Sequence, residues 1–486
     1  MIRVYFDWNI FSGLNQIIDD TQPFESIRTI IENYGDRLLF PYSPAHISDL
    51  KRSYKKSDKG QKLTLRDLKF LGEITQGNAL YEDHSKRRAF PGIRDPLDYF
   101  EEDIKDNLLD DFDIDKIFTG IDDPEIAAQG QRLLDQMKSI PSGIDFLQIK
   151  KLPDQYVKLK DLFENGEMED SYYNYLKVIS KIVTNSTEFS DVYKNARNYS
   201  IDQMKLETDT SRWGNPFDYL EKALPGLGIK QSLSEFVESS LNLLKLGDNP
   251  TRFETFNYYY MLLDAFGFNR DSTLPNLVDD SMHAYYGAYC DLFVTNDKRA
   301  YRKTKAVYNQ LNIGTIVCTA DEFPEQFYKL NYIGKGAEKS ILDSVTDIIS
   351  NSLILKETVD AELNPTKIFK IEKPVISYFN RLQLSEYDEY IGVYLYKRKW
   401  DSYSDFLFWT ELETITNKIV AQLGADKNNR KEFSEIDKAE LNEDRWPGRI
   451  WSGSSMNIRF SYREDLSYTI TLEVKKSAKN SPHLNK

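Results

Sequence analysis

The chain opens with two short apolar runs, each followed by a segment with helical spacing. Arg3–Phe6 has the residues of a short β-strand and ends at Asp7, after which apolar residues recur at three- and four-residue intervals. A second run, Leu38–Tyr42, is followed by Ser43 and Pro44, which are typical of a helix start. This order of strand, helix, strand and helix predicts a parallel sheet with crossover helices.

The same pattern returns far along the chain. Leu292–Thr295 and Thr315–Cys318 are predicted strands, and Lys298–Leu311 is a predicted helix between them. A further helix is predicted to start at Asp279 and Asp280. The residues between the two halves have mostly helical spacing, in four segments: Glu125–Met137, Glu167–Val183, Ser232–Leu246 and Phe253–Phe266. We therefore predict one α/β domain, formed by residues 1–50 and 276–333, which a mostly helical insertion over residues 51–275 divides.

The composition changes after Gly334, Lys335 and Gly336. Beyond this point two helices are predicted, over Ala337–Glu357 and Phe406–Leu423, together with strand-like segments at Tyr387–Tyr396 and Ile458–Val474. Residues 334–486 are thus predicted to form a small α+β domain. It has no catalytic spacing, so we expect it to bind a protein partner, a second copy of the chain or nucleic acid.

Composition narrows the classes of function. The 486 residues include 63 basic and 77 acidic side chains, a net charge of −14, which excludes a wholly basic nucleic-acid binder. Any contact with nucleic acid must therefore be local. The two cysteines, Cys290 and Cys318, are too few for a disulfide framework and fit a reducing compartment. No run approaches the roughly 18 apolar residues of a membrane helix, and the first residues lack the apolar core of a signal peptide. We expect no membrane contact and a cytoplasmic location.

Candidate chemistry lies where the predicted strands end. Asp7 ends the first strand, Asp297 follows a later one, Asp280 precedes that strand on a helix, and Asp49 lies on the helix after the second strand. Ligand sites of parallel sheets form outside the carboxyl ends of the strands, so these acids are expected to converge. Clustered carboxylates need a cation, and oxygen ligands suit Mg²⁺ or Mn²⁺. Such ions support metal-dependent hydrolysis of phosphodiesters.

Each acid also has an ordinary structural interpretation. Asp7 and Asp297 can be turn residues, and Asp280 can cap a helix, a role that Asp279 can share. Asp49 can be a surface carboxylate, and His283 is expected to pack or form hydrogen bonds rather than bind a ligand. The evidence for a site is the combination of these residues in one chain, because no single one of them is sufficient.

That combination resembles a PIN domain. Val4-Tyr5-Phe6-Asp7-Trp8-Asn9 and Tyr42–Leu50 resemble its opening half. Asp280–His283 and Tyr289–Lys298 resemble its closing half, and Asp-x-x-His followed by Cys-Asp and Phe-Val-Thr-x-Asp is the most specific part. The resemblance covers residues 1–50 and 276–325 and leaves the insertion and the C-terminal region unassigned.

The resemblance implies a PIN-like parallel sheet with flanking helices and a metal-dependent nuclease. The acids that would bind Mg²⁺ or Mn²⁺ and carry catalysis are Asp7, Asp49, Asp280 and Asp297. Asn9 would support Asp7, Thr295 would position Asp297, and Asp279 is an alternative third acid. The helix acid is Asp49 where the family often has Glu, which shortens its reach. The family favours single-stranded RNA over DNA as the substrate.

Basic residues flank these acids. Lys51, Arg52 and Lys55 follow Asp49, and five follow Asp297: Lys298, Arg299, Arg302, Lys303 and Lys305. A nucleic-acid backbone could lie across them, although a solvated surface explains them equally well. The acidic stretch from Asp95 to Glu125 is predicted to be a solvated surface or loop, with an autoinhibitory flap as the alternative.

Two other functions remain open. The chain could be a non-catalytic PIN-like scaffold or interaction protein, although a scaffold would not need to keep all four acids. It could also be a structure-specific DNA nuclease, which would cut flap-like DNA faster than single-stranded RNA.

Overall fold

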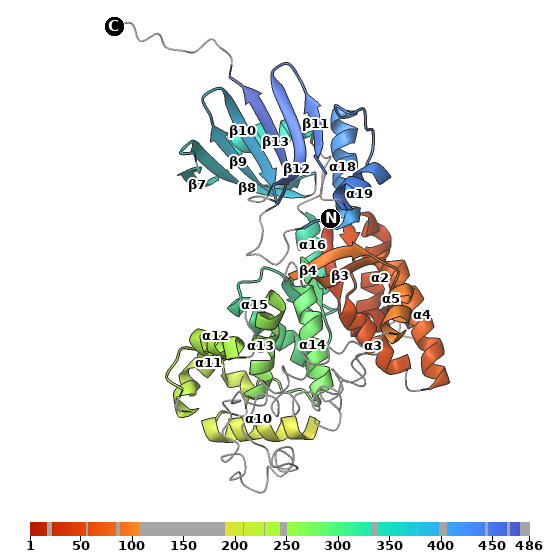
Figure 1. Ribbon diagram of the computed structural model, residues 1–486, viewed down its shortest axis with the longest axis vertical. Coiled ribbons are helices and arrows are strands. Elements are labelled where there is room, and N and C mark those ends of the chain that lie inside the picture. The colour runs from red at the N-terminus through yellow and green to blue at the C-terminus, as the bar shows by residue number, and fades with distance from the viewer. Residues whose placement is uncertain are drawn as a thin grey trace, which may run out of the picture.

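The structure is a computed structural model. It describes residues 1–16, 22–54, 57–83, 88–105, 190–207, 209–227, 229–243, 250–332, 339–360, 362–376, 378–397, 406–442, 446–463 and 467–476. Figure 1 shows an antiparallel sheet at the top and an α/β unit below it, with the N-terminus at the junction of the two. The predicted mixture of a parallel sheet flanked by helices and a separate C-terminal α+β unit is confirmed.

A parallel sheet of four strands forms the centre of the α/β unit, in the order β2-β1-β5-β6. Its strands are β1 (Ile2–Phe6), β2 (Leu38–Leu39), β5 (Leu292–Val294) and β6 (Ile316–Cys318). The register aligns Ile2 with Leu38 and Tyr5 with Phe293. The first and the later segment of the chain therefore share one sheet, with β1 and β5 as its central pair.

Helices cover both faces of this sheet, which explains why its strands are uninterrupted apolar runs. Val4 and Phe6 belong to a core that includes residues of α1 (Trp8–Asn15), α2 (Gln22–Tyr34) and α16 (Phe323–Tyr332). Tyr5 and Phe293 belong to the other core, with α14 (Leu274–Gly287) and α15 (Lys298–Gln310). The ends of β1 and β5 are thus held between two buried layers.

The start of α14 differs from the prediction. Thr273 caps this helix by accepting a hydrogen bond from the backbone N–H of Asn276 at 3.3 Å, and Pro275 lies in the first turn. The prediction of a helix start at Asp279 and Asp280 is therefore wrong, because both residues lie within the helix. A mid-helix position leaves their carboxylates available for tertiary contacts.

The insertion is not helical throughout. Helix α4 (Asp58–Thr75) ends at Gln76 and Gly77, whose φ angles of 51° and 72° turn the chain out of the helix. An antiparallel hairpin follows, β3 (Asn78–Asp83) and β4 (Arg88–Ile93). The hydroxyl groups of Tyr285 in α14 and of Tyr289 just after it accept hydrogen bonds from the backbone N–H of Ala89, so this part of the chain anchors the hairpin.

The other described elements between β2 and α14 are short helices. The α-helices are α3 (Pro44–Tyr54), α5 (Pro96–Lys105), α10 (Ser190–Met204), α11 (Pro216–Ala223), α12 (Leu233–Leu243) and α13 (Arg252–Ala265), and the 3₁₀ turns are η3 (Thr210–Arg212) and η4 (Leu224–Leu227), with η1 (Gly35–Arg37) just before β2. The helices predicted over Ser232–Leu246 and Phe253–Phe266 correspond to α12 and α13. Those predicted over Glu125–Met137 and Glu167–Val183 lie outside the described residues.

The C-terminal unit is a seven-stranded antiparallel sheet in the order β11-β12-β13-β10-β9-β8-β7, packed against α17, α18 and α19. Its elements are α17 (Ile341–Asn351), β7 (Ile354–Val359), β8 (Pro365–Val375), β9 (Phe379–Glu386), β10 (Tyr390–Tyr396), α18 (Trp409–Leu423), α19 (Glu435–Asn442), β11 (Arg449–Ser452), β12 (Met456–Arg463) and β13 (Ser467–Lys475). The helix predicted over Ala337–Glu357 is wrong beyond Asn351. Three of the six β7 residues are β-branched, and the segment pairs with β8.

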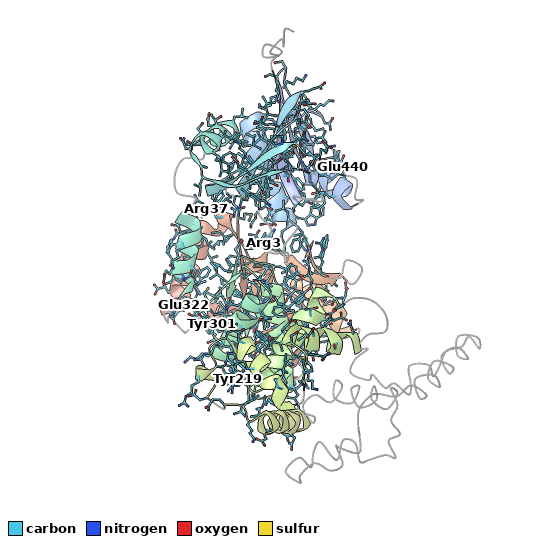
Figure 2. The ribbon with its side chains drawn as sticks, turned by 90° about the vertical axis from the view of Figure 1, so that its left-hand side faces the viewer. Arg3, Arg37, Tyr219, Tyr301, Glu322 and Glu440 are labelled. Atoms are coloured by element: carbon cyan, nitrogen blue, oxygen red, sulfur yellow. The ribbon has the colours of Figure 1, made fainter. Side chains whose placement is uncertain are left out.

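A buried ion pair joins the two units. Arg3 of β1 donates to Glu411 of α18 with an Nη2–Oε2 distance of 2.7 Å, and to the carbonyl oxygen of Phe406 at 2.6 Å. The two charged side chains are 3% and 0% exposed. Figure 2 shows Arg3 where the α/β unit meets the C-terminal unit. Within the described parts of the chain, the helices are too short or too polar to span a membrane.

Candidate functional site

A cavity of about 530 Å³ lies at the carboxyl ends of β1 and β5. All four acids predicted from the sequence line it, from four separate elements: Asp7, Asp49, Asp280 and Asp297. Two further acids, Asp271 and Asp279, also line it. The structure therefore brings the predicted acids together at the predicted edge of the sheet.

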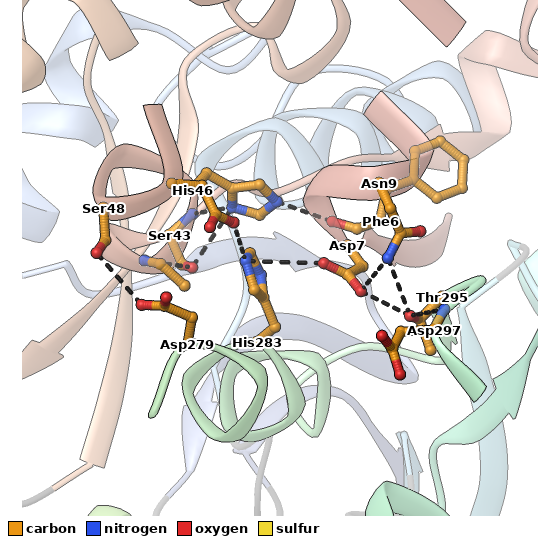
Figure 3. Close-up of polar contacts among 12 residues, drawn as sticks. Phe6, Asp7, Asn9, Ser43, His46, Ser48, Asp279, His283, Thr295 and Asp297 are labelled. Carbon is orange, nitrogen blue, oxygen red and sulfur yellow. Dashed lines mark hydrogen bonds and ion pairs between the residues drawn. The ribbon is translucent and has the colours of Figure 1, made fainter. Parts of the chain in front are cut away.

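Asp7 is fixed by the polar residues around it. Its Oδ2 accepts hydrogen bonds from Thr295 Oγ1 at 2.6 Å and from Asn9 Nδ2 at 2.5 Å. Thr295 also accepts a hydrogen bond from the backbone N–H of Asp297 at 3.1 Å, so it links the two acids (Figure 3). Burial raises the pKa of Asp7, and the positive charge of His283 and the bond from Thr295 offset only part of this.

His283 lies between Asp7 and Asp49. Its Nε2 is 2.9 Å from Asp49 Oδ2 and 3.8 Å from Asp7 Oδ1, and Figure 3 shows the ring rising from α14 toward Asp7. Burial alone would lower the pKa of His283, but the two carboxylates raise it above its ordinary value. Burial would raise the pKa of Asp49, but hydrogen bonds and charges from His283 and Arg52 lower it.

Asp279 and Asp280 have different surroundings although they are adjacent. Asp279 forms an ion pair with Arg52 and accepts a hydrogen bond from Ser48 at 3.3 Å. Asp280 has no hydrogen bond or ion pair within the described residues. Burial, followed by the negative charges of Asp271 and Asp7, raises the pKa of Asp280 well above its ordinary value. Asp280 is thus the acid whose charge is least compensated.

Asp297 serves partly as a helix cap. Its Oδ1 accepts hydrogen bonds from the backbone N–H groups of Arg299 at 2.7 Å and Ala300 at 3.0 Å, as the turn interpretation of this residue allows. Its Oδ2 makes no hydrogen bond within the described parts of the chain. One carboxylate oxygen therefore remains for a ligand.

A buried charge network supports the cavity floor. Asp271 pairs with Lys303, a completely buried lysine that also lies 3.5 Å from Asp264. Asp264 in turn pairs with Arg197 at 2.8 Å. The expectation that Lys303 belongs to a surface for nucleic acid is therefore wrong, because its ammonium group is enclosed by α13 and α15 and compensates buried carboxylates.

The other predicted basic residues fall into two groups. Arg52 pairs with Asp49 at 2.8 Å, and Lys51 pairs with Asp103 at 2.6 Å, so acids of this chain neutralise both. Lys298, Arg299 and Arg302 are exposed, and Arg299 lines the cavity. Lys55 lies outside the described residues, as does the predicted acidic stretch beyond Lys105.

Two residues of the site could not be assigned to it from their sequence context alone. The sequence predicts only packing or hydrogen bonding for His283, and its spacing of three residues from Asp280 is the signal that puts both on one helix face. Asp271 comes from the turn between α13 and α14, where the sequence gives no signal.

The side chains do not form a ready-made metal centre. Among the described residues, no group of three or more His, Cys, Asp or Glu side chains is placed to hold a metal ion. The donor chemistry nevertheless fits a hard cation, because oxygen ligands surround the cavity and the poorly compensated Asp280 lies near Asp7 and Asp271. Comparisons of the chain with known protein families, with curated proteins and with solved structures found no match.

Proposed function

We propose that this protein is a PIN-like nuclease that hydrolyses phosphodiester bonds in single-stranded RNA with Mg²⁺ or Mn²⁺. The observation that carries this proposal is the convergence of Asp7, Asp49, Asp280 and Asp297 on one cavity at the carboxyl edge of a parallel sheet. The preference for RNA rests on the resemblance of the sequence segments to PIN domains.

The charges of the site support a cation-dependent reaction. A nucleic-acid backbone would be repelled by acids that lack counter-charges, and Arg52 and His283 compensate mainly Asp49, Asp279 and Asp7. Asp280 and the second oxygen of Asp297 would hold the metal together with Asp7. Bound there, the ion would polarise the phosphodiester and lower the pKa of a bound water molecule.

The chain's own residues then have distinct tasks. Asn9 and Thr295 fix Asp7 through its Oδ2, so that Oδ1 faces the cavity side where His283 lies. Arg299, exposed at the first turn of α15, is placed to contact a phosphate at the cavity rim. The scissile phosphate would thus be held between acids that bind the cation and a guanidinium that binds the backbone.

The test is cleavage of end-labelled single-stranded RNA, single-stranded DNA and flap DNA by the full chain with Mn²⁺, Mg²⁺ or EDTA. We expect RNA cutting that requires the metal and that Asp7→Asn abolishes, while Asp36→Asn, an exposed acid in η1, leaves it unchanged. Faster cutting of flap DNA would identify flap DNA, instead of single-stranded RNA, as the substrate. No cutting together with no Mn²⁺ binding in calorimetry would contradict the proposal and favour the scaffold.

A second prediction concerns the exposed cations at the cavity. We expect Lys298→Ala/Arg299→Ala to weaken binding of single-stranded RNA and to reduce the slope of log affinity against log salt by about 0.7 for each phosphate that the variant no longer neutralises. Fluorescence anisotropy over a salt series measures this. Lys329→Ala, an exposed lysine of α16, is the matched control and should leave the slope unchanged. An unaltered slope in the double variant would remove these residues from the binding surface.

A further inference from the structure

His283 has a position that packing alone does not require. Its imidazole is 2% exposed, lies on the wall of the acidic cavity, and directs Nε2 at Asp49 and Asp7. Asp280 and His283 are three residues apart in the middle of α14, so both side chains occupy the same face of the helix. An imidazole nitrogen in this position is available either to donate a hydrogen to Asp49 or to share a lone pair with a cation.

A chain of hydrogen bonds on the other side of the ring gives Nδ1 of His283 a fixed partner. The chain runs through Tyr5 Oη, which is 3.0 Å from His283 Nδ1 and 2.6 Å from Ser43 Oγ. It continues from Ser43 to His46, a contact that Figure 3 shows. It ends at the carbonyl oxygen of Phe6, 2.8 Å from His46 Nε2. Because a carbonyl can only accept, His46 Nε2 carries the hydrogen, and its Nδ1 accepts one from the backbone N–H of Ser43 at 3.1 Å.

The hydroxyl hydrogens between His46 and His283 can point in either of two directions. In one direction, His46 Nδ1 accepts the hydroxyl hydrogen of Ser43, Ser43 Oγ accepts from Tyr5, and Tyr5 Oη accepts from Nδ1–H of His283. In this direction the Nε2 of His283 has a lone pair that a cation can bind. In the other direction Tyr5 donates to Nδ1 and Nε2–H donates to Asp49, which suits the metal-free protein, so a bound cation would take the place of the Nε2 hydrogen. Metal-binding histidines typically donate their second ring N–H to a fixed acceptor in this manner.

We propose that His283 Nε2 is a nitrogen ligand of the metal ion, beside Asp49 and Asp7, and that the site therefore prefers Mn²⁺ to Mg²⁺. The 2.9 Å between Nε2 and Asp49 Oδ2 matches the spacing of neighbouring ligands around an octahedral ion, about 3 Å for bonds of about 2.1 Å. Imidazole suits transition metals, whereas Mg²⁺ takes oxygen ligands, so the nitrogen sets the preference. This inference rests on the proposed function, because it assumes that the cavity binds a metal.

The experiment is pulsed electron paramagnetic resonance of the full-length protein loaded with Mn²⁺ alone. We expect modulation from a directly bound ¹⁴N nucleus, which changes to the ¹⁵N pattern when only the histidines are ¹⁵N-labelled. Labelling needs no substitution, so the result does not depend on a variant that folds. His283→Gln should lose the nitrogen modulation and weaken Mn²⁺ binding at least about tenfold in calorimetry, while Mg²⁺ binding changes little.

Tyr5→Phe is the second variant, since it keeps the ring and removes the hydroxyl that contacts His283 Nδ1 and Ser43. We expect it to keep the nitrogen modulation and to weaken Mn²⁺ binding by a smaller factor than His283→Gln. Mn²⁺ that binds the wild-type protein without nitrogen modulation would overturn the ligand assignment and leave the proposed nuclease standing. Failure of the wild-type protein to bind Mn²⁺ at all would overturn both proposals.

Discussion

Asp280→Asn is expected to reduce metal-dependent cleavage of single-stranded RNA by roughly a thousandfold and, at the same time, to raise the unfolding temperature of the metal-free protein. The loss corresponds to several kcal/mol of transition-state stabilisation, which is the scale of a metal ion's contribution to phosphoryl chemistry. A gain in stability together with a loss of activity is the mark of a residue kept for function.

The gain follows from the surroundings of the carboxylate. Asp280 is partly buried near Asp271, Asp7 and Asp297 and has no hydrogen bond or ion pair within the described residues. Its negative charge therefore destabilises the folded chain when no cation is bound. Asparagine has the same shape without the charge, so the repulsion disappears while the packing of α14 is kept.

Thermal unfolding with and without Mn²⁺, combined with the RNA assay, measures both effects. Mn²⁺ should raise the unfolding temperature of the wild-type protein and not that of Asp280→Asn, since a ligand stabilises only the state that binds it. Asp36→Asn is again the matched control and should behave as wild type in both assays. A variant that is less stable than wild type but still cuts RNA would contradict both the assigned position and the role of Asp280.

The strand-ending acids can be predicted because the signal is local. Asp7 and Asp297 follow buried strands, and in a parallel sheet such residues meet at one edge whatever lies between them in the sequence. The supporting bonds from Asn9 and Thr295 are local to those ends as well. The sequence therefore contains enough information to place the edge and most of its carboxylates.

The remaining features depend on contacts that the sequence pattern does not record. Asp279 and Asp280 can cap a helix on propensity alone, but Thr273 and Pro275 start α14 earlier and turn both acids into interior residues. Segment β7 continues the apolar pattern of the helix before it and becomes a strand through its pairing with β8. Asp271 enters the site from a turn, and only the enclosed Lys303 explains why a carboxylate is tolerated there.

Glu411→Gln is expected to destabilise the protein by about 3 to 5 kcal/mol, because it removes the carboxylate that pairs with the buried guanidinium of Arg3. It also replaces the carboxylate that accepts a hydrogen bond from the backbone N–H of Phe408 at 3.0 Å. Urea unfolding of the full chain measures the loss. Arg3→Met/Glu411→Met should cost less than either single change, since both buried charges are then removed together. Costs that simply add would show that the two charges are not coupled.

The same pair predicts how stability depends on pH. Burial would raise the pKa of Glu411, but the charge and hydrogen bonds of Arg3 lower it below its ordinary value of 4.5. The ion pair therefore stabilises the fold fully above the unfolded carboxyl's pKa, and this stabilisation is lost as the pH falls through the lowered folded value. The difference in unfolding free energy between wild type and Glu411→Gln should be constant near neutral pH and shrink below about pH 4.5. A difference that persists at pH 3 would assign the loss to packing at the junction of β1 and α18 instead of to charge. RNA cleavage, measured well below the unfolding temperature of the variant, should change little, because Arg3 is at the opposite end of β1 from Asp7.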